Sequence, residues 1–352
     1  MAIIEVSGLT KHYGGGRFPP HFPPWRRREH VRALSNLDLA VEDGEIFGFL
    51  GPNGAGKTTT IRLLLGFLHP TAGGGRVLGH DIGQDNLAIR AATGYLPGGI
   101  ALYDTLTGEQ VLDYLARLYR RPTPLRAELV DRLELSNRTL KRPVRDYSRG
   151  MRQKVGIIQA LQHDPQLAIL DEPTEGLDPL MQHAFYDLLE SRRGSGRTIF
   201  FSSHVLSEVE RVCDRVAIIR GGELVALSNV TELLARRQRR VEMRVDGPPP
   251  VLDGVAGVSA VEIRDGLLRC RLEGDVGPFL ASLRDVRVTD LTIEPARLEE
   301  AFLEFYAEQE EMSDEQLVDD DDAGKADDAG MADDAGPADD AGPADIEMGE
   351  RT

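Results

Sequence analysis

One stretch of nine residues constrains this chain more than any other. Residues 51–59 read GPNGAGKTT and match the pattern G-x-x-x-x-G-K-[ST]. An apolar run of strand length, residues 45–50, precedes it, and residues 60–68 have the apolar spacing of a helix. Glycines allow a strand-to-helix loop to turn so tightly that several backbone N–H groups converge on phosphate oxygens. The stretch therefore predicts a nucleoside triphosphate site in an α/β fold.

The residues of this glycine loop have separate expected tasks. Lys57 is expected to reach the β- and γ-phosphates as a point charge, and the Thr58 hydroxyl to ligate Mg²⁺. The helix that follows adds the positive end of its dipole. The expected nucleotide contacts are Gly51, Pro52, Asn53, Gly54, Ala55, Gly56, Lys57, Thr58 and Thr59.

The formal net charge of -17 is concentrated at one end of the chain. Residues 308–352 carry 18 acidic and two basic side chains, so residues 1–307 are close to neutral. Within that segment Asp-Asp-Ala-Gly recurs with period six from Asp321, a composition too polar and too charged to bury a core. We predict a disordered acidic tail at 308–352 that keeps the protein soluble or binds a basic partner.

Cysteine content and apolar runs indicate the compartment. Cys213 and Cys270 form neither a metal-ligand cluster nor a disulfide framework, which suits a reducing cytoplasm. The first residues lack the basic start and apolar core of a signal peptide. No apolar run approaches the roughly 20 residues that a membrane span needs. We therefore expect a chain that crosses no membrane by itself.

Two further motifs point to phosphate chemistry. Residues 167–173 read LAILDEP, where four apolar residues fit a buried strand that ends in Asp171 and Glu172. Asp171 is expected to hold Mg²⁺ through water, and Glu172 to orient an attacking water. Residues 146–154, DYSRGMRQK, open a predicted helix to about residue 162. Ser148 and Gly150 at its start form either a second anion site or an ordinary N-cap.

Three more candidates follow from position along the chain. Asp178 lies in the turn TEGLDP at 174–179, and His204 follows a predicted buried strand at 197–201. The histidine either contacts a γ-phosphate or is a capping or surface residue. Tyr13, shortly after a predicted strand at 3–6, either offers a flat face to a purine ring or packs in the ordinary way.

Proline-rich and helical segments complete the outline. Residues 14–30 contain Phe18, Phe22 and Trp25 beside three arginines and are too rich in proline for regular structure. They form a disordered loop or contact lipid headgroups, a partner or nucleic acid. We also expect strands at 31–41, 76–78 and 93–96, helices within 107–121 and 125–133, and a terminal hairpin at 216–226.

The order of these motifs resembles that in the nucleotide-binding subunit of an ABC transporter, over residues 2–236. The motifs are the glycine loop, the Ser-Arg-Gly segment, the Asp-Glu strand end, the Gly-Leu-Asp turn and the histidine. The resemblance implies a P-loop NTPase core with an antiparallel β subdomain and a helical insert at about 98–165. It identifies residues 51–59 as Walker A and 167–172 as Walker B. The roles that it implies are the catalytic carboxylate for Glu172, the signature for Ser148 and Gly150, the D-loop for Asp178, the switch histidine for His204 and adenine stacking for Tyr13.

The sequence departs from the family pattern at several positions. Arg149 and Met151 replace the usual residues of the signature, and Gly98 stands where the family has Gln or Glu in the Q-loop. Glycine has no side chain to sense Mg²⁺ or water, so the link from nucleotide to membrane partner is in question. The segment 14–30 is longer than usual, so Trp25 is an alternative to Tyr13 for base stacking.

Residues 240–307 have a different pattern. Strands are expected at 241–245, 261–263 and 267–272, and an amphipathic helix at 297–306. This ending resembles the small C-terminal domain of drug and antibiotic-resistance ABC exporters. The resemblance implies a small α+β domain before the acidic tail.

The resemblance also implies a function. The chain is expected to bind and hydrolyse ATP with Mg²⁺ for an exporter, at the cytoplasmic face of the membrane and with a separate permease. Lys57, Glu172 and His204 would carry catalysis in a head-to-tail homodimer with ATP between the copies. Nucleic acid is not an expected partner. The alternatives are a soluble ABC ATPase and a nucleotide sensor uncoupled from transport, the latter motivated by Gly98.

Overall fold

The computed structural model describes residues 2–14, 31–235 and 239–294. Most of the proline-rich segment, the helix expected at 297–306 and the acidic tail lie outside these ranges. The glycine loop and the other candidate site residues from Tyr13 to His204 lie within them, except Trp25, the alternative to Tyr13. None of the helices in the described ranges is both long and apolar enough to cross a bilayer.

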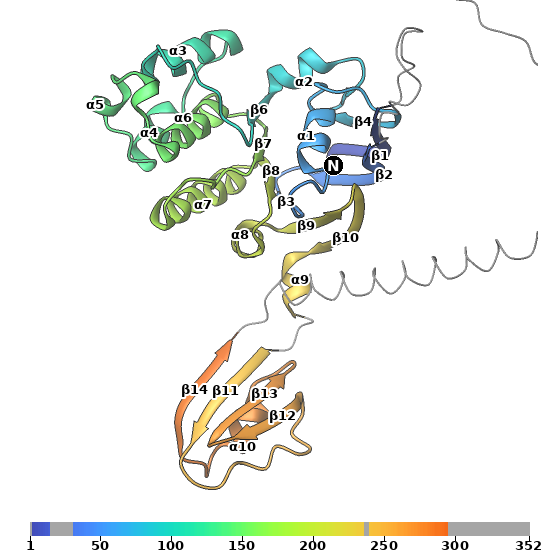
Figure 1. Ribbon diagram of the computed structural model, residues 1–352, viewed down its shortest axis with the longest axis vertical. Coiled ribbons are helices and arrows are strands. Elements are labelled where there is room, and N and C mark those ends of the chain that lie inside the picture. The colour runs from blue at the N-terminus through green and yellow to red at the C-terminus, as the bar shows by residue number, and fades with distance from the viewer. Residues whose placement is uncertain (1, 15–30, 236–238, 295–352) are drawn as a thin grey trace, which may run out of the picture. The chain divides into compact units, whose positions relative to one another are not determined.

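A six-stranded sheet carries the candidate motifs (Figure 1). Its order is β10-β9-β3-β8-β7-β6, and all neighbours are parallel except β10, which pairs antiparallel with β9 at one edge. The strands are β3 (Ile46–Leu50), β6 (Thr93–Leu96), β7 (Leu167–Asp171), β8 (Thr198–Ser203), β9 (Arg215–Arg220) and β10 (Glu223–Asn229). Every residue of β3, β7 and β8 is buried, because layers cover both faces of a parallel sheet. The expected α/β core is confirmed.

A second, antiparallel sheet has the order β2-β1-β4-β5. Its strands are β1 (Ala2–Tyr13), β2 (Val31–Glu42), β4 (Ala72–Val77) and β5 (His80–Asp81). The first strand is longer than the predicted 3–6, because its pairing with β2 continues to Tyr13 opposite Val31. This difference places Tyr13 at the end of a strand and not in the loop after one.

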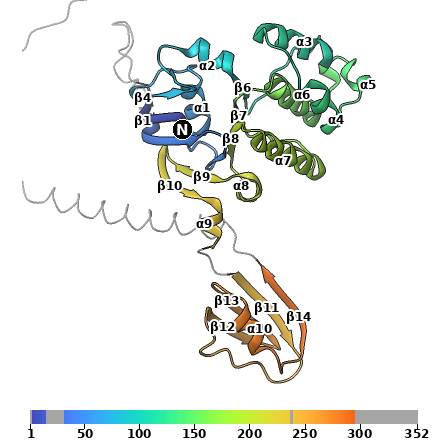
Figure 2. The same cartoon turned by 180° about the vertical axis from the view of Figure 1, so that it is seen from behind.

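Helices follow the strands and fill the segment between β6 and β7. They are α1 (Lys57–Leu64), α2 (Asn86–Ala92), α3 (Gly108–Tyr119), α4 (Arg126–Arg132), α5 (Asn137–Leu140), α6 (Arg149–Leu161), α7 (Pro179–Gly194), α8 (Leu206–Val212) and α9 (Val230–Ala235). Figures 1 and 2 show α3, α4 and α5 gathered around α6, beyond the β6 edge of the sheet. Thr107 starts α3 with a capping box to Gln110, which is a local signal for a helix start.

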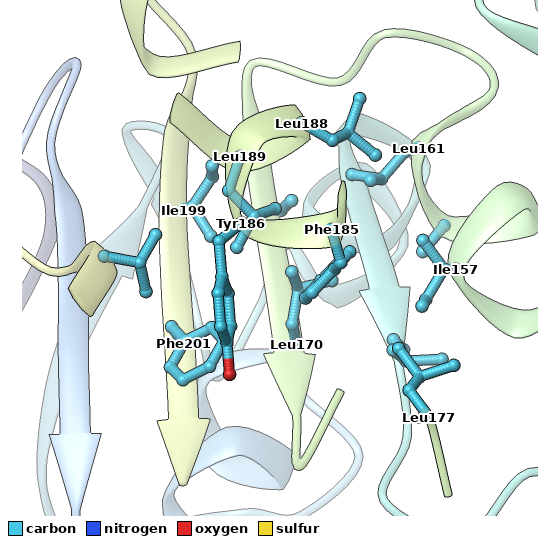
Figure 3. Close-up of a cluster of buried hydrophobic side chains, with 14 of the residues drawn as sticks. Ile157, Leu161, Leu170, Leu177, Phe185, Tyr186, Leu188, Leu189, Ile199 and Phe201 are labelled. Carbon is cyan, nitrogen blue, oxygen red and sulfur yellow. The ribbon is translucent and has the colours of Figure 1, made fainter. Parts of the chain in front are cut away.

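The main sheet separates two apolar cores, because successive side chains of a strand point to opposite faces. Phe200 packs in the core shared with α1 and the antiparallel sheet, while Ile199 and Phe201 pack in the core shared with α6 and α7. Figure 3 shows this second core, where Phe185, Leu188 and Leu189 of α7 lie over the strands. The two cores fix the sheet from both sides and hold its strand ends in place.

The last described segment, residues 239–294, forms a four-stranded antiparallel sheet of order β12-β13-β11-β14 with one short helix. The elements are β11 (Arg239–Val245), β12 (Val258–Arg264), β13 (Leu267–Leu272), α10 (Gly277–Ser282) and β14 (Val288–Glu294). Alternate residues of β11 and β13, such as Val241 and Leu268, pack against Phe279 of α10 in a separate core. The strands expected at 241–245, 261–263 and 267–272 lie within β11, β12 and β13, whereas α10 and β14 were not predicted.

His163 gives the fold a pH-dependent stability. Its side chain is 7% exposed and stacks on Tyr119 with ring centroids 4.4 Å apart. Neither ring nitrogen has a hydrogen-bond partner among the described residues. Burial, helped by the positive charge of Arg121, lowers the pKa of His163 to about 4. The neutral ring is therefore the form that this core accepts.

We expect the unfolding free energy to fall as pH is lowered from about 6.5 to about 4, because only the unfolded chain binds a proton at this ring in that window. The expected contribution of His163 is about 3 kcal/mol. His163→Phe should remove that part of the pH dependence in urea unfolding measured at several pH values. His183→Phe, at an exposed position of α7, is the control and should keep the parent slope. Equal slopes for the parent and His163→Phe would contradict this assignment.

Candidate active site

Backbone pairing brings three motifs to one edge of the main sheet. β8 lies between β3 and β7, with Leu50 opposite Ser203 and Asp171 opposite Ser202. The N–H of Gly51 donates to the carbonyl of Ser203 at 3.3 Å, and the N–H of Glu172 donates to the carbonyl of Ser202 at 3.1 Å. The start of the glycine loop, the acidic pair and the segment before His204 therefore lie side by side at the carboxyl ends of the strands, where open α/β sheets bind ligands.

The glycine loop fits closely against its neighbours. Gly56 has φ of 107° and caps the start of α1, and a Cβ there would lie 2.6 Å from the carbonyl oxygen of Ala33 on β2. A Cβ on Gly51 would lie 2.4 Å from the carbonyl oxygen of Ile219 on β9. Two strands therefore confine the loop, and only glycine fits at these positions. The first residues of α1, Lys57 to Thr59, line the cavity described below, and no side chain caps this helix start. The first N–H groups of a helix have no partner within the helix, so this is an arrangement that can bind phosphate.

Lys57 places a buried positive charge inside this loop. Its side chain is 6% exposed, and Nζ donates to the carbonyl of Gly51 at 2.6 Å and to that of Pro52 at 3.3 Å. Nζ also lies 3.2 Å from Oε1 of Glu172, which forms an ion pair without hydrogen-bond geometry. The lysine thus connects the glycine loop to the strand end that carries the acidic pair.

Asp171 is held by two hydroxyl groups. The side chain is 2% exposed and accepts hydrogen bonds from Oγ1 of Thr58 at 2.9 Å and from Oγ of Ser202 at 2.8 Å. The charge of Asp171 also acts on Tyr95 of the neighbouring strand β6. Burial, and then this negative charge, raise the pKa of the Tyr95 hydroxyl to about 12. A hydroxyl and a carboxylate oxygen side by side are the hard donors that Mg²⁺ prefers, so these residues fit that ion. Ser202 was missed because nothing in the local sequence distinguishes it from a strand end.

Glu172 and His204 form a pair next to the lysine. Nδ1 of His204 lies 2.7 Å from Oε2 of Glu172. The two oxygens of Glu172 thus lie between a lysine and a histidine, one on each side. Glu172 has φ of 49°, a left-handed conformation that is uncommon for a residue with a side chain. Such strain persists only where the surroundings hold it, and it occurs often at functional sites.

A cavity of about 350 Å³ opens over Lys57, Asp171 and Glu172. Its lining consists of Val31, Arg32, Ala33, Pro52, Asn53, Gly54, Gly56, Lys57, Thr58, Thr59, Gly98, Asp171 and Glu172. Arg32 and its neighbours on β2 were not predicted, because only the tertiary fold brings this strand to the loop. Tyr13 pairs with Val31 and therefore adjoins the cavity, while Trp25 lies outside the described residues. A Cβ on Gly98 would lie 3.3 Å from Oδ2 of Asp171, so the expected Q-loop position does reach the site.

Several candidates are not among the described residues that line this cavity. Four of them lie next to a lining residue: Gly51, Ala55, Tyr13 and His204. The other three are Ser148, Gly150 and Asp178. Ser148 caps α6 by accepting from the N–H of Met151 at 3.2 Å, and Asp178 caps α7 by accepting from that of Met181 at 3.0 Å. A Cβ on Gly150 would lie 2.7 Å from the carbonyl oxygen of Gly176, so the start of α6 packs on the turn before α7. Ser148, Gly150 and Asp178 therefore belong to a second group of residues, on the starts of two helices.

Comparison with known proteins identifies relatives of this chain. Residues 34–175 match the family model described as ABC transporter. An uncharacterised ABC transporter ATP-binding protein of Nostoc is 38% identical over 86% of this chain and 89% of its own length. The daunorubicin resistance ATP-binding protein DrrA3 of Streptomyces coeruleorubidus is 36% identical over 66% of this chain and 70% of its own length. A solved ATP-binding subunit of an ABC transporter is 30% identical with a TM-score of 0.56, covering 66% of this chain and 91% of its own.

The close fit of the glycine loop can be tested with two alanine substitutions. Gly54 and Gly56 both have positive φ, 83° and 107°, but a Cβ on Gly54 would meet nothing within 4 Å. We expect Gly54→Ala to lower the unfolding free energy by about 1 kcal/mol, from backbone strain alone. Gly56→Ala should lower it by roughly 2–4 kcal/mol, because the methyl group also meets Ala33. Denaturant unfolding measures both, and equal losses would show that the contact with β2 is not tight.

Proposed function

The chain belongs to the ATP-binding proteins of ABC transporters, and we propose that it is the ATP-binding and ATP-hydrolysing subunit of a membrane exporter. The observation that carries this proposal is that Lys57, Glu172 and His204 lie together at one edge of the sheet, beside a helix start whose N–H groups have no side-chain cap. Hydrolysis of a triphosphate needs two elements in one place: donors for the phosphate oxygens, and a carboxylate that acts on a water molecule.

Binding of the triphosphate falls to the glycine loop. The N–H groups at the start of α1 and the Lys57 ammonium neutralise phosphate oxygens, and both are already oriented by the fold. Thr58 and Asp171 would hold Mg²⁺, which supplies positive charge to the phosphate oxygens when bound. The remaining loop residues, Gly51 to Thr59, contribute backbone contacts. Tyr13 pairs with Val31, which lines the cavity, and its ring stacks on the base of the nucleotide.

Hydrolysis falls to Glu172 and His204. The Glu172 carboxylate orients and polarises the attacking water by accepting a hydrogen bond from it, while the loop stabilises the charge on the transferred phosphoryl group. His204 contacts that carboxylate through its Nδ1, which leaves its other ring nitrogen, Nε2, to donate a hydrogen bond to the γ-phosphate. The left-handed backbone conformation at Glu172, which its surroundings hold, sets the direction in which the carboxylate leaves the strand end.

A second copy of the chain completes the site. Ser148, Gly150 and Asp178 lie on the helix starts of the second group and not on the cavity of their own chain. In a head-to-tail homodimer, the start of α6 in one copy faces the glycine loop of the other and adds its N–H groups to the γ-phosphate. ATP binding then closes the dimer, and hydrolysis reopens it.

Export requires a separate permease. In this proposal the helical insert at about 98–165 transmits closure, which is supported by its start at Gly98 beside Asp171 and its end before β7. The protein therefore works at the cytoplasmic face of a membrane. We propose the division of the chain into an ATPase domain at 2–236, a small α+β domain at 240–307 and an acidic tail at 308–352. The similarity to a daunorubicin resistance protein supports export of a small molecule.

Replacing the proposed catalytic carboxylate tests the assignment. Glu172→Gln keeps the volume of the side chain, so ATP binding should be retained, while steady-state ATP hydrolysis should fall by orders of magnitude. The variant should also accumulate as an ATP-bound dimer in size-exclusion chromatography with light scattering. Glu190→Gln, which alters an exposed ion pair with Arg211, is the matched control and should hydrolyse ATP normally. A parent rate in Glu172→Gln would contradict the assignment.

Coupling to a permease is tested by activity in the presence of the membrane partner. A tagged copy should co-purify a protein with several membrane spans, and ATP hydrolysis should rise when that protein is present in lipid vesicles. Gly98→Gln should leave ATP binding intact and change the degree of this stimulation, because residue 98 adjoins Asp171. Hydrolysis that is independent of any membrane protein would instead indicate a soluble ATPase, and negligible turnover a sensor.

A further inference from the structure

A buried glutamate in α8 connects the two strand ends that carry the proposed catalytic pair. Glu208 is 8% exposed. Its Oε1 accepts a hydrogen bond from Oγ1 of Thr174 at 2.5 Å, and its Oε2 accepts one from Oγ of Ser203 at 2.6 Å. Thr174 follows Glu172 by two residues, and Ser203 directly precedes His204. One carboxylate therefore holds both of the segments from which the catalytic side chains extend.

A third hydroxyl faces the same carboxylate. Burial, then the negative charge of Glu208 and a hydrogen bond to it, raise the pKa of Tyr186 above its usual range. The Tyr186 hydroxyl thus stays protonated and available to the carboxylate. Figure 3 shows its ring between α7 and the sheet, with the hydroxyl beside Phe201 near the carboxyl end of β8. Three buried hydroxyl groups stabilise the charge of a carboxylate by hydrogen bonding and do not neutralise it. Because a satisfied buried network of this kind is rigid, the segments that it joins are fixed relative to one another.

The contacts on either side of His204 show what this rigidity fixes. The Oγ of Ser203 also accepts from the N–H of Val205 at 3.0 Å, so one hydroxyl joins the residue before the histidine to the residue after it. On the other strand end, Nε2 of Gln153 donates to the carbonyl of Pro173 at 2.7 Å. The peptide segments on both sides are thus fixed by buried hydrogen bonds.

We propose that Glu208 is a positioning residue, which sets the distance and orientation between Glu172 and His204 by holding Thr174 and Ser203. This inference rests on the proposed ATP hydrolysis. It assigns no contact between Glu208 and nucleotide, because Glu208 is not among the described residues that line the cavity. Its effect is therefore expected on the chemical step and not on ATP affinity.

The test is Glu208→Gln in the full-length chain. The amide keeps the volume but loses one acceptor, so the Ser203 or the Thr174 hydroxyl loses its partner. We expect kcat to fall by about tenfold or more with little change in the KM for ATP, because a small misplacement is costly to the chemical step. Glu190→Gln is the control. The Glu190 carboxylate on α7 pairs at the surface with Arg211, which lies on the same helix as Glu208, and this variant should keep the parent kcat.

A double-mutant cycle separates positioning from general stability. In a His204→Ala background the same Glu208→Gln change should cost little further activity, because there is no histidine left to position. Equal losses in both backgrounds, or a kcat within twofold of the parent, would overturn the proposal.

The NMR resonance of the His204 ring gives a readout that is independent of turnover. This resonance should shift in Glu208→Gln without nucleotide, and an unchanged resonance would also overturn the proposal. Absence of hydrolysis in the parent chain would instead contradict the proposed function.

Discussion

The site depends on the pairing of β8 between β3 and β7. This pairing aligns Leu50 with Ser203 and Asp171 with Ser202, so that the glycine loop and the acidic pair start from the same level of the sheet. A shift of one residue in a strand moves every side chain to the other face, so the register is specified by the two apolar cores as well as by the backbone hydrogen bonds. The chemistry at the edge therefore rests on phenylalanines and leucines that never contact a nucleotide.

The charges at this edge are held mostly by neutral dipoles. Asp171 accepts hydrogen bonds from two hydroxyl groups, and Lys57 donates to two carbonyl groups. Glu208 accepts from the hydroxyl groups of Thr174 and Ser203, and that of Tyr186 faces it as a third. Neutral partners fix the position of a buried charge without cancelling it, so the charge remains available to a ligand. Glu172 differs, because it lies between Lys57 and His204. The carboxylate that is proposed to act on water is thus the one with charged or chargeable partners.

Much of this arrangement could be predicted from the sequence, and the reason is that its parts are contiguous. The glycine loop, the Asp-Glu strand end and the helix start at Ser148 each have a local signal, and each has the expected secondary structure in the fold. The structure adds what pairs these parts: Ser202 with Asp171, Ala33 against Gly56, and Glu208 between two strand ends. None of these partners has a pattern of its own along the chain.

The sequence by itself determined the kind of chemistry, an α/β sheet and the family, because glycine, lysine and carboxylates at fixed spacing are needed wherever a phosphate loop follows a strand. Only the tertiary structure decided that β8 lies between the two motif strands, that β2 confines the loop, and that Ser148 and Gly150 do not line the cavity of their own chain. Strand order and helix placement follow from packing among residues more than a hundred positions apart, such as Phe47 and Phe200. Local patterns do not encode contacts at that separation, because each pattern is compatible with several arrangements of the layers.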